Sequence, residues 1–587
     1  MSLLKTSATS LMRSSVFALA SALTLVACDD DNGGSDSGGA SGGGGEDSVG
    51  GTRARGGSGG RTSRGGSGGT SATNTAGATS IGGSSAVAGS SAVGGQGGDT
   101  STAGAGGTAN GGTTAQSIGG TATTGGTSSS IGGATSNGGT SSGGTTAAGG
   151  TDGVGGAADL CRGIELPASQ YYVPSGLCVR AVATNQGQLR QITFDADGAL
   201  LGVTVNGAVR RYRDLNNDGM YSGDAEITQI ADTGGNGHNI HFDAASGYLY
   251  AGTPTGVRRW AYQTNATTLG AGEQVVTDQP STGLNPFHTV HLYDGWLYVS
   301  SGSESNVSTP AAPAYDTHRS VLKRFRMSDF TPGTPFAWTA GEVFATGIGN
   351  MLGFTRNQLG RMYGVDTGID DLVYATRDEH LDNPGEDLLL LQQGGTYGYP
   401  YCFTASHIVT NNVVVNPGTQ LATGVSGFTN PHDDLWCSNN SAAPITFMPP
   451  HSSPTDLAFF DTAPTGGLPE TFRGGAFVAL HGSDNLTPSV GYQVIYVPFT
   501  ANGTAARPTA DQASTTFPFP VIFGGGSGTS AVPGRWQWQS GSSGENPVRP
   551  IGVAISPVDG ALYISSDNGS VSSGTPQGHI YRVAAQR

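Results

Sequence analysis

One short pattern returns six times in the C-terminal part of the chain, and it constrains the fold more than any other feature. Each copy has an apolar segment, a turn with Gly or Asp, and a short strand of alternating apolar residues. Such a hairpin cannot bury both of its faces alone, so the copies must pack against one another. The pattern predicts an all-β fold, a six-bladed β-propeller. The strands open at Gly198, Gly247, Gly295, Gly360, Gly475 and Gly560.

The number of blades depends on how the longer intervals between copies are divided. The step from Gly198 to Gly247 is 49 residues and the step from Gly247 to Gly295 is 48 residues. The interval from 360 to 475 is much longer and hard to divide, so a five- or seven-bladed ring is the alternative. We expect the last strand, "GHIYRVAA", to join the first blade and close the ring.

The first quarter of the chain has a composition that opposes folding. Residues 32–156 are nearly all Gly, Ser, Thr and Ala, with almost no large apolar side chains. Such a segment cannot bury enough surface to offset the entropy of ordering. We therefore predict a disordered tether over residues 28–158 and a propeller over residues 159–587.

The N-terminus has the features of an export signal. Lys5 and Arg13 precede a short apolar run, which ends in "LVAC" at Cys28. This ending resembles the lipobox of bacterial lipoproteins and predicts a signal peptide over 1–27 with lipidation of Cys28. The alternative is an ordinary signal peptide with an incidental cysteine. An exported lipoprotein would be anchored to a membrane, in the periplasm or at the cell surface.

The four remaining cysteines suggest disulfides, because their number is even and the chain is expected to be exported. Proximity favours two bonds, Cys161–Cys178 and Cys402–Cys437, although four cysteines permit three pairings. Their wide spacing and the few nearby histidines argue against a metal site.

The charge of the chain excludes one class of partner. With 27 basic and 43 acidic residues the net charge is −16, which argues against binding nucleic acid. No glycine-rich phosphate loop precedes a helix, so a nucleotide cofactor is unsupported as well.

Several stretches together resemble the soluble sugar dehydrogenases that use pyrroloquinoline quinone (PQQ), especially their sorbosone dehydrogenase-like branch. These stretches include "HTVHLYDGWLYVSSGSESNV", "FATGIGNMLGF", "NPGEDLLLLQQGGTYGYPYC" and "RPIGVAISPVDGALYISSDNG". The resemblance implies a six-bladed ring with PQQ on one face, an assisting calcium ion, and a sugar or polyol substrate. The electron acceptor is not implied.

The resemblance also implies roles for individual residues. His288 stands where the family has its catalytic base, and Asn350 matches the asparagine of an Arg-Asn pair that contacts the cofactor. The arginine of that pair is Gly349 here, which removes a cation next to the quinone. Arg356 and Arg377 could compensate from loops.

A second departure from the family lies in "HGSDNLTP". His481 and Asn485 are retained as cofactor contacts, but Asp484 and Leu486 stand where relatives often carry Trp and Arg. The loss of arginines weakens the expected binding of a tricarboxylate such as PQQ, because guanidinium groups suit carboxylates best.

Two further blade starts carry candidate contacts. Arg549 and His451 are candidates for contacts with the cofactor or the substrate. The alternative is that each makes hydrogen bonds to a neighbouring blade. The backbone carbonyls of Gly368 and Ile369 align loosely with the carbonyls that bind the active-site calcium ion in the family. Three nearby acids are either ligands or solvated charges: Asp366, Asp370 and Asp371.

A separate motif, "DLNNDGMYSGDAE", has the spacing of the first half of a calcium loop. Asp214, Asn216 and Asp218 would be ligands of a structural calcium ion. The closing acid is displaced, because the expected position is Ala225 and Glu226 follows it. A plain turn rich in Asp and Asn is the alternative.

Two functions therefore remain open from the sequence. The first is an envelope-anchored quinoprotein that oxidises a sugar with PQQ. The second is a non-catalytic propeller that binds a glycan or a protein at the cell surface, for which the missing arginines would be expected.

Overall fold

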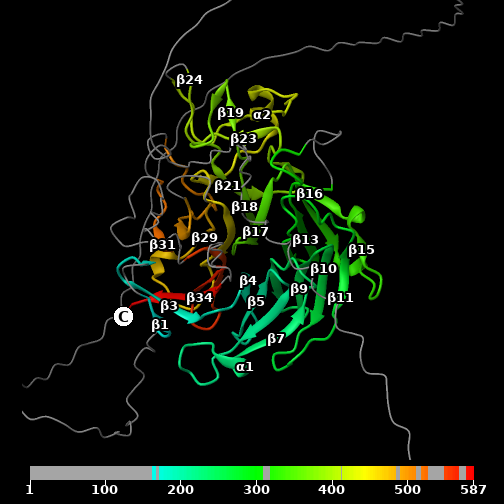
Figure 1. Cartoon of the computed structure of the whole chain (residues 1–587), viewed down its shortest axis with the longest axis vertical. Coiled ribbons are helices and arrows are strands. Elements are labelled where there is room, and N and C mark those ends of the chain that lie inside the picture. The colour runs from blue at the N-terminus through cyan, green and yellow to red at the C-terminus, as the bar shows by residue number, and fades with distance from the viewer. Residues whose placement is uncertain are drawn as a thin grey trace, which may run out of the picture. The chain divides into compact units, whose positions relative to one another are not determined.

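A computed structural model describes the chain in eight segments, so the predicted signal peptide, Cys28 and the predicted tether lie outside the described residues. They are residues 161–166, 171–308, 318–410, 413–483, 490–509, 517–525, 548–567 and 577–586. These segments form a ring of six sheets, each built on four antiparallel strands, so the six-bladed prediction is confirmed (Figure 1).

Six strands line the centre of the ring, one from each blade, and most contact the innermost strand of the next blade. In chain order they are β4 (Leu189–Phe194), β8 (Ile240–Asp243), β12 (Val290–Tyr293), β17 (Asn350–Arg356), β28 (Pro454–Phe459) and β32 (Pro550–Ile555). We number the blades 1 to 6 in this order.

Each blade continues outward through antiparallel strands. The second strands are β5 (Leu200–Thr204), β9 (Tyr248–Thr253), β13 (Trp296–Ser301), β18 (Met362–Thr367), β29 (Ala476–Leu480) and β33 (Leu562–Ser566). The third strands are β6 (Ala208–Tyr212), β10 (Gly256–Ala261), β14 (Val321–Arg326), β21 (Glu386–Leu391), β30 (Gln493–Val497) and β34 (His579–Ala585). The fourth strands are β7 (Ile227–Asp232), β11 (Glu273–Thr277), β16 (Glu342–Thr346), β27 (Thr446–Met448), β31 (Val521–Gly525) and, in blade 6, β3 (Leu177–Ala183).

The turn between the first and second strands of blade 3 shows why the repeat carries its glycine. Asp294 and Gly295 have φ angles of 50° and 75°. Two successive positive φ values are those of the tight hairpin turn that Asp-Gly favours. The repeated Asp/Gly signal in the sequence therefore marks the link between the first two strands of a blade.

The ring has no single hydrophobic core. Six separate clusters of buried apolar residues lie between neighbouring blades, one cluster for each pair. Alternate residues of one strand serve two clusters: Leu177 and Val179 pack between blades 5 and 6, whereas Cys178 and Val182 pack between blades 6 and 1. This period-two division explains why the strands are apolar on both faces.

The closure of the ring differs from the prediction. The segment "GHIYRVAA" forms β34 of blade 6 and does not extend blade 1; instead β3, from the start of the folded region, completes blade 6 by pairing with β34. The chain has an additional strand ahead of its first full repeat, and that strand fills the open edge of the last blade. The preceding β1 (Ile164–Glu165) extends the same sheet, and β2 (Tyr171–Tyr172) extends blade 5.

Two edge strands and three short helical turns complete the outer rim. They are β15 (Phe336–Ala337) in blade 2, β22 (Gly395–Thr396) in blade 3, and the turns Met327–Asp329, Trp338–Ala340 and Glu470–Phe472. The helix α1 (Gly223–Glu226) precedes β7. Among the described residues, no helix has both the length and the apolar character needed to cross a bilayer.

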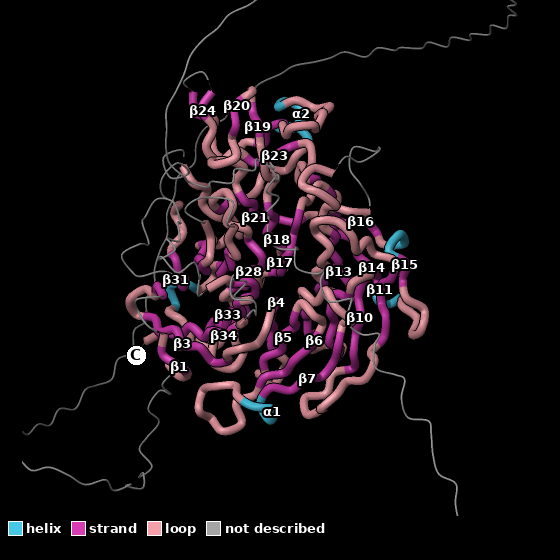
Figure 2. The backbone as a smooth tube through the Cα atoms, viewed as in Figure 1, coloured by secondary structure: helices cyan, strands magenta, loops and turns pink. Residues whose placement is uncertain are grey.

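The long interval in the sequence holds an insertion within blade 4 (Figure 2). It contains three small hairpins and the helix α2 (Asp434–Asn440). The hairpins pair β19 (Val373–Tyr374) with β20 (Arg377–Asp378), β23 (Cys402–Thr404) with β26 (Gln420–Ala422), and β24 (Val409–Thr410) with β25 (Val413–Val414).

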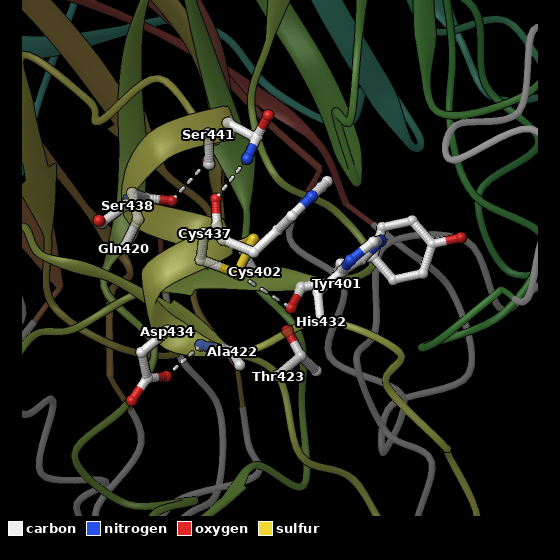
Figure 3. Close-up of a disulfide and its surroundings, with 12 residues drawn as sticks. Tyr401, Cys402, Gln420, Ala422, Thr423, His432, Asp434, Cys437, Ser438 and Ser441 are labelled. Atoms are coloured by element: carbon white, nitrogen blue, oxygen red, sulfur yellow. Dashed lines mark hydrogen bonds between the residues drawn. A yellow bond between two sulfur atoms is a disulfide. The ribbon is translucent and has the colours of Figure 1, made fainter.

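A disulfide fixes this insertion (Figure 3). Cys402 of β23 is bonded to Cys437 of α2, and the Asp434 carboxylate accepts the backbone N–H of Ala422 at 2.8 Å. The other bond joins Cys161 to Cys178 of β3. The pairing that proximity favoured is therefore the one the structure contains.

Candidate active site

One end of the ring gathers the loops that could form a site. Each innermost strand begins there, and each second strand ends there because the two run antiparallel. We call this end the entry face. The segments just before β12, β17, β28 and β32 therefore converge on it, and these are the segments that carry His288, Gly349, His451 and Arg549.

A network of hydrogen bonds crosses the centre of the ring below this face. A register shift between Asn350 and Gly353 interrupts the pairing of β17, and the carbonyl oxygen of Leu352 accepts three side-chain hydrogen bonds. The donors are Gln191 Nε2 at 2.8 Å, His238 Nε2 at 2.9 Å and Thr289 Oγ1 at 2.7 Å. The innermost strands of blades 1, 3 and 4 and the loop before β8 are thus tied at one point.

A cavity lies toward the opposite end of the ring from the entry face. Its volume is about 650 Å³, and the later parts of the innermost strands line it, including His291, Phe354 and Asp456. The Asp456 carboxylate accepts the backbone N–H groups of Leu457 at 2.9 Å and of Val553 at 3.0 Å, so it links blades 5 and 6. Burial raises the pKa of Asp456 to about 8.

The entry face holds a buried charged cluster near the ring's centre. Arg190 of β4 contacts Asp567 at 3.3 Å and His238 Nδ1 at 3.1 Å, and His481 Nε2 lies 3.1 Å from the same carboxylate oxygen of Asp567. Arg549 donates to the carbonyl of the residue after His481 at 3.4 Å. All five side chains are nearly inaccessible to solvent.

The guanidinium groups of this cluster shift the pKa values of the groups beside them. Burial alone would raise the pKa of Asp567, but His481, Arg190 and Arg549 hold it far below its usual value, so Asp567 is ionised. Burial, followed by the neighbouring guanidinium groups, lowers the pKa of His481 and of His238, and Asp567 opposes this shift at His481. Among the described residues, Asp567 therefore faces two guanidinium groups, those of Arg190 and Arg549.

His288 lies at the same end, just before β12, and is 1% exposed. Burial lowers its pKa to about 4, with a smaller opposing contribution from the backbone of Pro254. Neither ring nitrogen makes a hydrogen bond of good geometry within the described part of the chain. Gly252 permits this placement, because a Cβ there would come within 2.4 Å of the His288 carbonyl oxygen. The histidine is therefore neutral at pH 7 and retains unused acceptor capacity.

The structure explains the missing arginine at Gly349. A Cβ on Gly349 would lie 3.1 Å from the ring of Tyr399, so this tyrosine covers the place where an arginine side chain would begin. The Tyr399 hydroxyl donates to the Ser305 carbonyl at 2.9 Å. The backbone N–H groups of Gly349 and Asn350 both donate to Asp366, at 2.9 and 2.7 Å.

Comparison with known proteins identifies the family. The TrAA12-like family model matches residues 171–575, which is most of the folded region. The chain belongs to the TrAA12-like family.

Two curated relatives show how far this similarity extends. A pyrroloquinoline quinone-dependent pyranose dehydrogenase of Coprinopsis cinerea is 27% identical over 69% of this chain, which spans only 54% of that protein. A pyrroloquinoline quinone-dependent sugar dehydrogenase of Hypocrea jecorina is 30% identical over 57% of this chain and 76% of its own length.

Solved structures show the same fold. The iodide structure of the Trichoderma reesei AA12 enzyme has a TM-score of 0.57 at 25% identity, over 71% of this chain and 98% of that one. The holo PQQ domain of Coprinopsis cinerea pyranose dehydrogenase has a TM-score of 0.58 at 23% identity, over 72% and 99% of the two chains.

The two residues that could have compensated for the missing arginine of this TrAA12-like chain lie elsewhere. Arg356 ends β17, at the opposite end of the strand from Asn350, and is paired with Asp294. Arg377 is exposed in the insertion, where it binds the Val409 carbonyl. Neither residue lies at the place of the missing arginine, so the possibility that they compensate for it has no support in the structure.

The buried cations of the site are Arg190 and Arg549 instead. The sequence suggested Arg549 but missed Arg190 and Asp567. Both missed residues stand where a blade repeat meets the entry face, in "QLRQITF" and "YISSDNG". Their positions within the repeat could have identified them, because the start of each first strand and the end of each second strand lie at the entry face.

The structure describes most of the remaining residues that were predicted to contact the cofactor or a calcium ion. Gly368 and Ile369 follow β18 on the entry face, and the Gly368 N–H donates to Glu386 at 2.7 Å; their role as calcium ligands stays a prediction. His451 lies at the entry to β28 and bonds the His380 carbonyl at 2.6 Å. Asn485, together with its neighbours Asp484 and Leu486, lies outside the described residues.

The loop that was predicted to bind a structural calcium ion has the hydrogen bonds of an Asp/Asn-rich turn. Asp214 accepts the backbone N–H groups of Asp218 and Gly219 at 3.1 and 2.9 Å, and Asn216 accepts that of Asp218 at 2.9 Å. The Glu226 carboxylate caps both ends of the loop at 3.0 and 2.8 Å. These contacts account for the motif without an ion, and calcium binding here stays a prediction.

Proposed function

We propose that this protein is a PQQ-dependent sugar dehydrogenase, which oxidises a hydroxyl-bearing carbon of a sugar or polyol and passes two electrons to an external acceptor. The observation that carries the proposal is the buried cluster of Arg190, Arg549 and Asp567, at the same end of the ring as a neutral histidine. Two TrAA12-like relatives with PQQ-dependent activity support it.

The site's unused hydrogen-bonding capacity fits a polar anionic cofactor. Among the described residues, no hydrogen-bond partner of good geometry is found for four buried atoms: both ring nitrogens of His288, Nδ1 of His481 and one carboxylate oxygen of Asp567. Buried polar atoms left in this way cost free energy unless a ligand completes them. PQQ is a tricarboxylate, and guanidinium groups are the side chains best suited to carboxylates.

Each residue then has a separate task. Arg190 and Arg549 would hold the cofactor's anionic groups, while Asp567 fixes the orientation of Arg190 and His481. PQQ, when bound, supplies the two-electron acceptor that the protein itself lacks. His288 would accept the hydroxyl proton of the sugar on a ring nitrogen, because it is neutral and has no competing partner of good geometry. Asn350 would contact the cofactor beside it.

A calcium ion is part of this proposal. The carbonyl oxygens of Gly368 and Ile369 are hard donors of the kind calcium prefers. Gly368 is exposed on the entry face, and its backbone is held by Glu386. The calcium-bound structure of the Trichoderma reesei AA12 enzyme is consistent with such a site.

The decisive experiment is reconstitution. Purified protein is mixed with PQQ and calcium, and quinone absorbance and sugar-dependent dye reduction are measured. We expect both, with dye reduction lost in His288→Ala and kept in the control His407→Gln, which changes a histidine of the blade 4 insertion. Absence of quinone binding would refute the proposal. Binding of a glycan without turnover would favour the non-catalytic alternative.

We further propose that the protein is exported and lipid-anchored through Cys28. The support is the sequence "LVAC" after a basic start and an apolar run. Labelling with a fatty-acid analogue followed by membrane fractionation tests this. Cys28→Ser should lose both the label and the membrane association, and an unlabelled wild-type protein would contradict the proposal.

A further inference from the structure

A cluster of two histidines and one aspartate stands at the entry face between blades 4 and 5. Asp370 and His380 flank the β19–β20 hairpin of the insertion, and His451 precedes β28. One oxygen of Asp370 and one ring nitrogen from each histidine all lie within 4.8 Å of one another. Among the described residues this is the one group of His, Cys, Asp and Glu donors gathered so closely.

The geometry is close to what a tetrahedral ion needs. Zinc–ligand bonds of about 2.1 Å place neighbouring donor atoms about 3.4 Å apart. The His380 Nδ1–Asp370 Oδ1 distance is already 2.8 Å. The rings of His380 and His451 meet edge to face with centroids 4.7 Å apart. Side-chain movements of about an ångström would complete the site.

The surroundings hold these donors in position. Asn306 donates to the Asp370 carbonyl and accepts the Asp370 N–H, both at 2.8 Å, which clamps the backbone of this ligand. His451 is held by the His380 carbonyl at 2.6 Å. Partners that orient metal-binding side chains in this way are typical of metal sites.

The donor set selects the kind of ion. Two imidazoles and one carboxylate suit zinc and related transition metals, whereas calcium prefers six to eight oxygen ligands. The side chains of Asp370 and His380 are 16% and 24% exposed, so an ion could enter and a water molecule could complete the coordination. We infer that Asp370, His380 and His451 bind a divalent transition-metal ion of the zinc class.

Such an ion would tie the insertion to the ring. Asp370 directly follows Ile369, so the ion would also fix the loop that carries the proposed calcium ligands. The inference does not depend on the proposed enzymatic function, because it needs neither PQQ nor a sugar.

Zinc titration of the full-length protein tests the inference. The protein is stripped with a chelator, supplied with excess calcium to fill oxygen-ligand sites, and titrated with Zn²⁺ alone by calorimetry, without PQQ. Wild type should bind one zinc ion per chain. His380→Gln and His451→Gln should each weaken binding by at least the roughly 10- to 100-fold seen when metal-site residues are disturbed. The control is His432→Gln, a histidine of the same insertion that stacks on Trp436 instead.

Cobalt provides a second measurement that needs no variant. Co²⁺ added to the wild-type protein should give the strong visible absorption of a four- or five-coordinate ion with nitrogen ligands. The weak spectrum of an ion surrounded only by oxygen would overturn the inference. Equal zinc binding by wild type and the double variant His380→Gln/His451→Gln, with both folded by circular dichroism, would overturn it as well.

Discussion

The buried carboxyl group of Asp456 should make stability depend on pH in a direction opposite to that of ordinary acids. Its carboxylate lies in the central channel and accepts hydrogen bonds from Leu457 and from Val553 of the next blade. Burial raises its pKa from 3.8 to about 8, despite these two bonds. Replacing it with asparagine removes the titration but keeps nearly the same shape.

The magnitude follows from linkage between protonation and folding. Between pH 4 and pH 8 the folded protein keeps the Asp456 proton and the unfolded chain does not, so stability falls as the pH rises. Each pH unit costs up to about 1.4 kcal/mol, and the four units together reach about 5 kcal/mol. Below pH 4 Asp456 is protonated in both the folded and the unfolded state. The stability then no longer depends on pH through this group.

Urea unfolding at several pH values measures the effect. The stability of Asp456→Asn relative to wild type should rise steadily from pH 4 to pH 8. Asp197→Asn, which changes an exposed carboxylate in the first turn of blade 1, should show no such slope. If Asp456→Asn and wild type instead keep a constant difference across this range, the carboxyl group is not buried as described.

Three further predictions concern the site and its support. Because His288 must be neutral to accept a proton and its pKa is about 4, kcat/KM should stay level as the pH falls from 7 to 5 and drop only below that; an acid limb near 6.5 would contradict the assignment. Arg190→Met should weaken PQQ binding by about 1.5–3 kcal/mol, the usual worth of a charged hydrogen bond, as measured by quinone fluorescence titration; an unchanged affinity would remove Arg190 from the site. Replacing Cys402 and Cys437 together with alanine should cost about 4 kcal/mol in urea unfolding, because their bond closes a loop of 35 residues; a loss below about 1 kcal/mol would show that the insertion does not limit stability.

The sequence could predict the ring because the repeat is local. Each Asp-Gly or similar turn sets one hairpin, and the alternation of apolar residues sets its two buried faces. How the ring closes depends on a pairing between residues such as Leu177 and Ala585, from opposite ends of the folded region, and no local pattern reveals that. The insertion in blade 4 was recognisable only as an interval too long for one blade.

The candidate site was harder to predict for a related reason. His288 and Asn350 could be located because the stretches around them resemble motifs of the PQQ-dependent sugar dehydrogenases. The replacement for the cation missing at Gly349 could not, because Arg190 comes from a different blade and Tyr399 from the insertion. Contacts between blades are set by the ring, which brings together residues that are far apart in the sequence.

The pairing of β3 with β34 also has a consequence for the order of events during synthesis. The strand that begins the ring emerges first but has no partner until the end of the folded region has been made. Until then the interfaces on both sides of blade 6 stay open, and the ring cannot close. Under the export that we propose, this delay would be an advantage, because translocation across a membrane requires a polypeptide that has not yet reached its final fold.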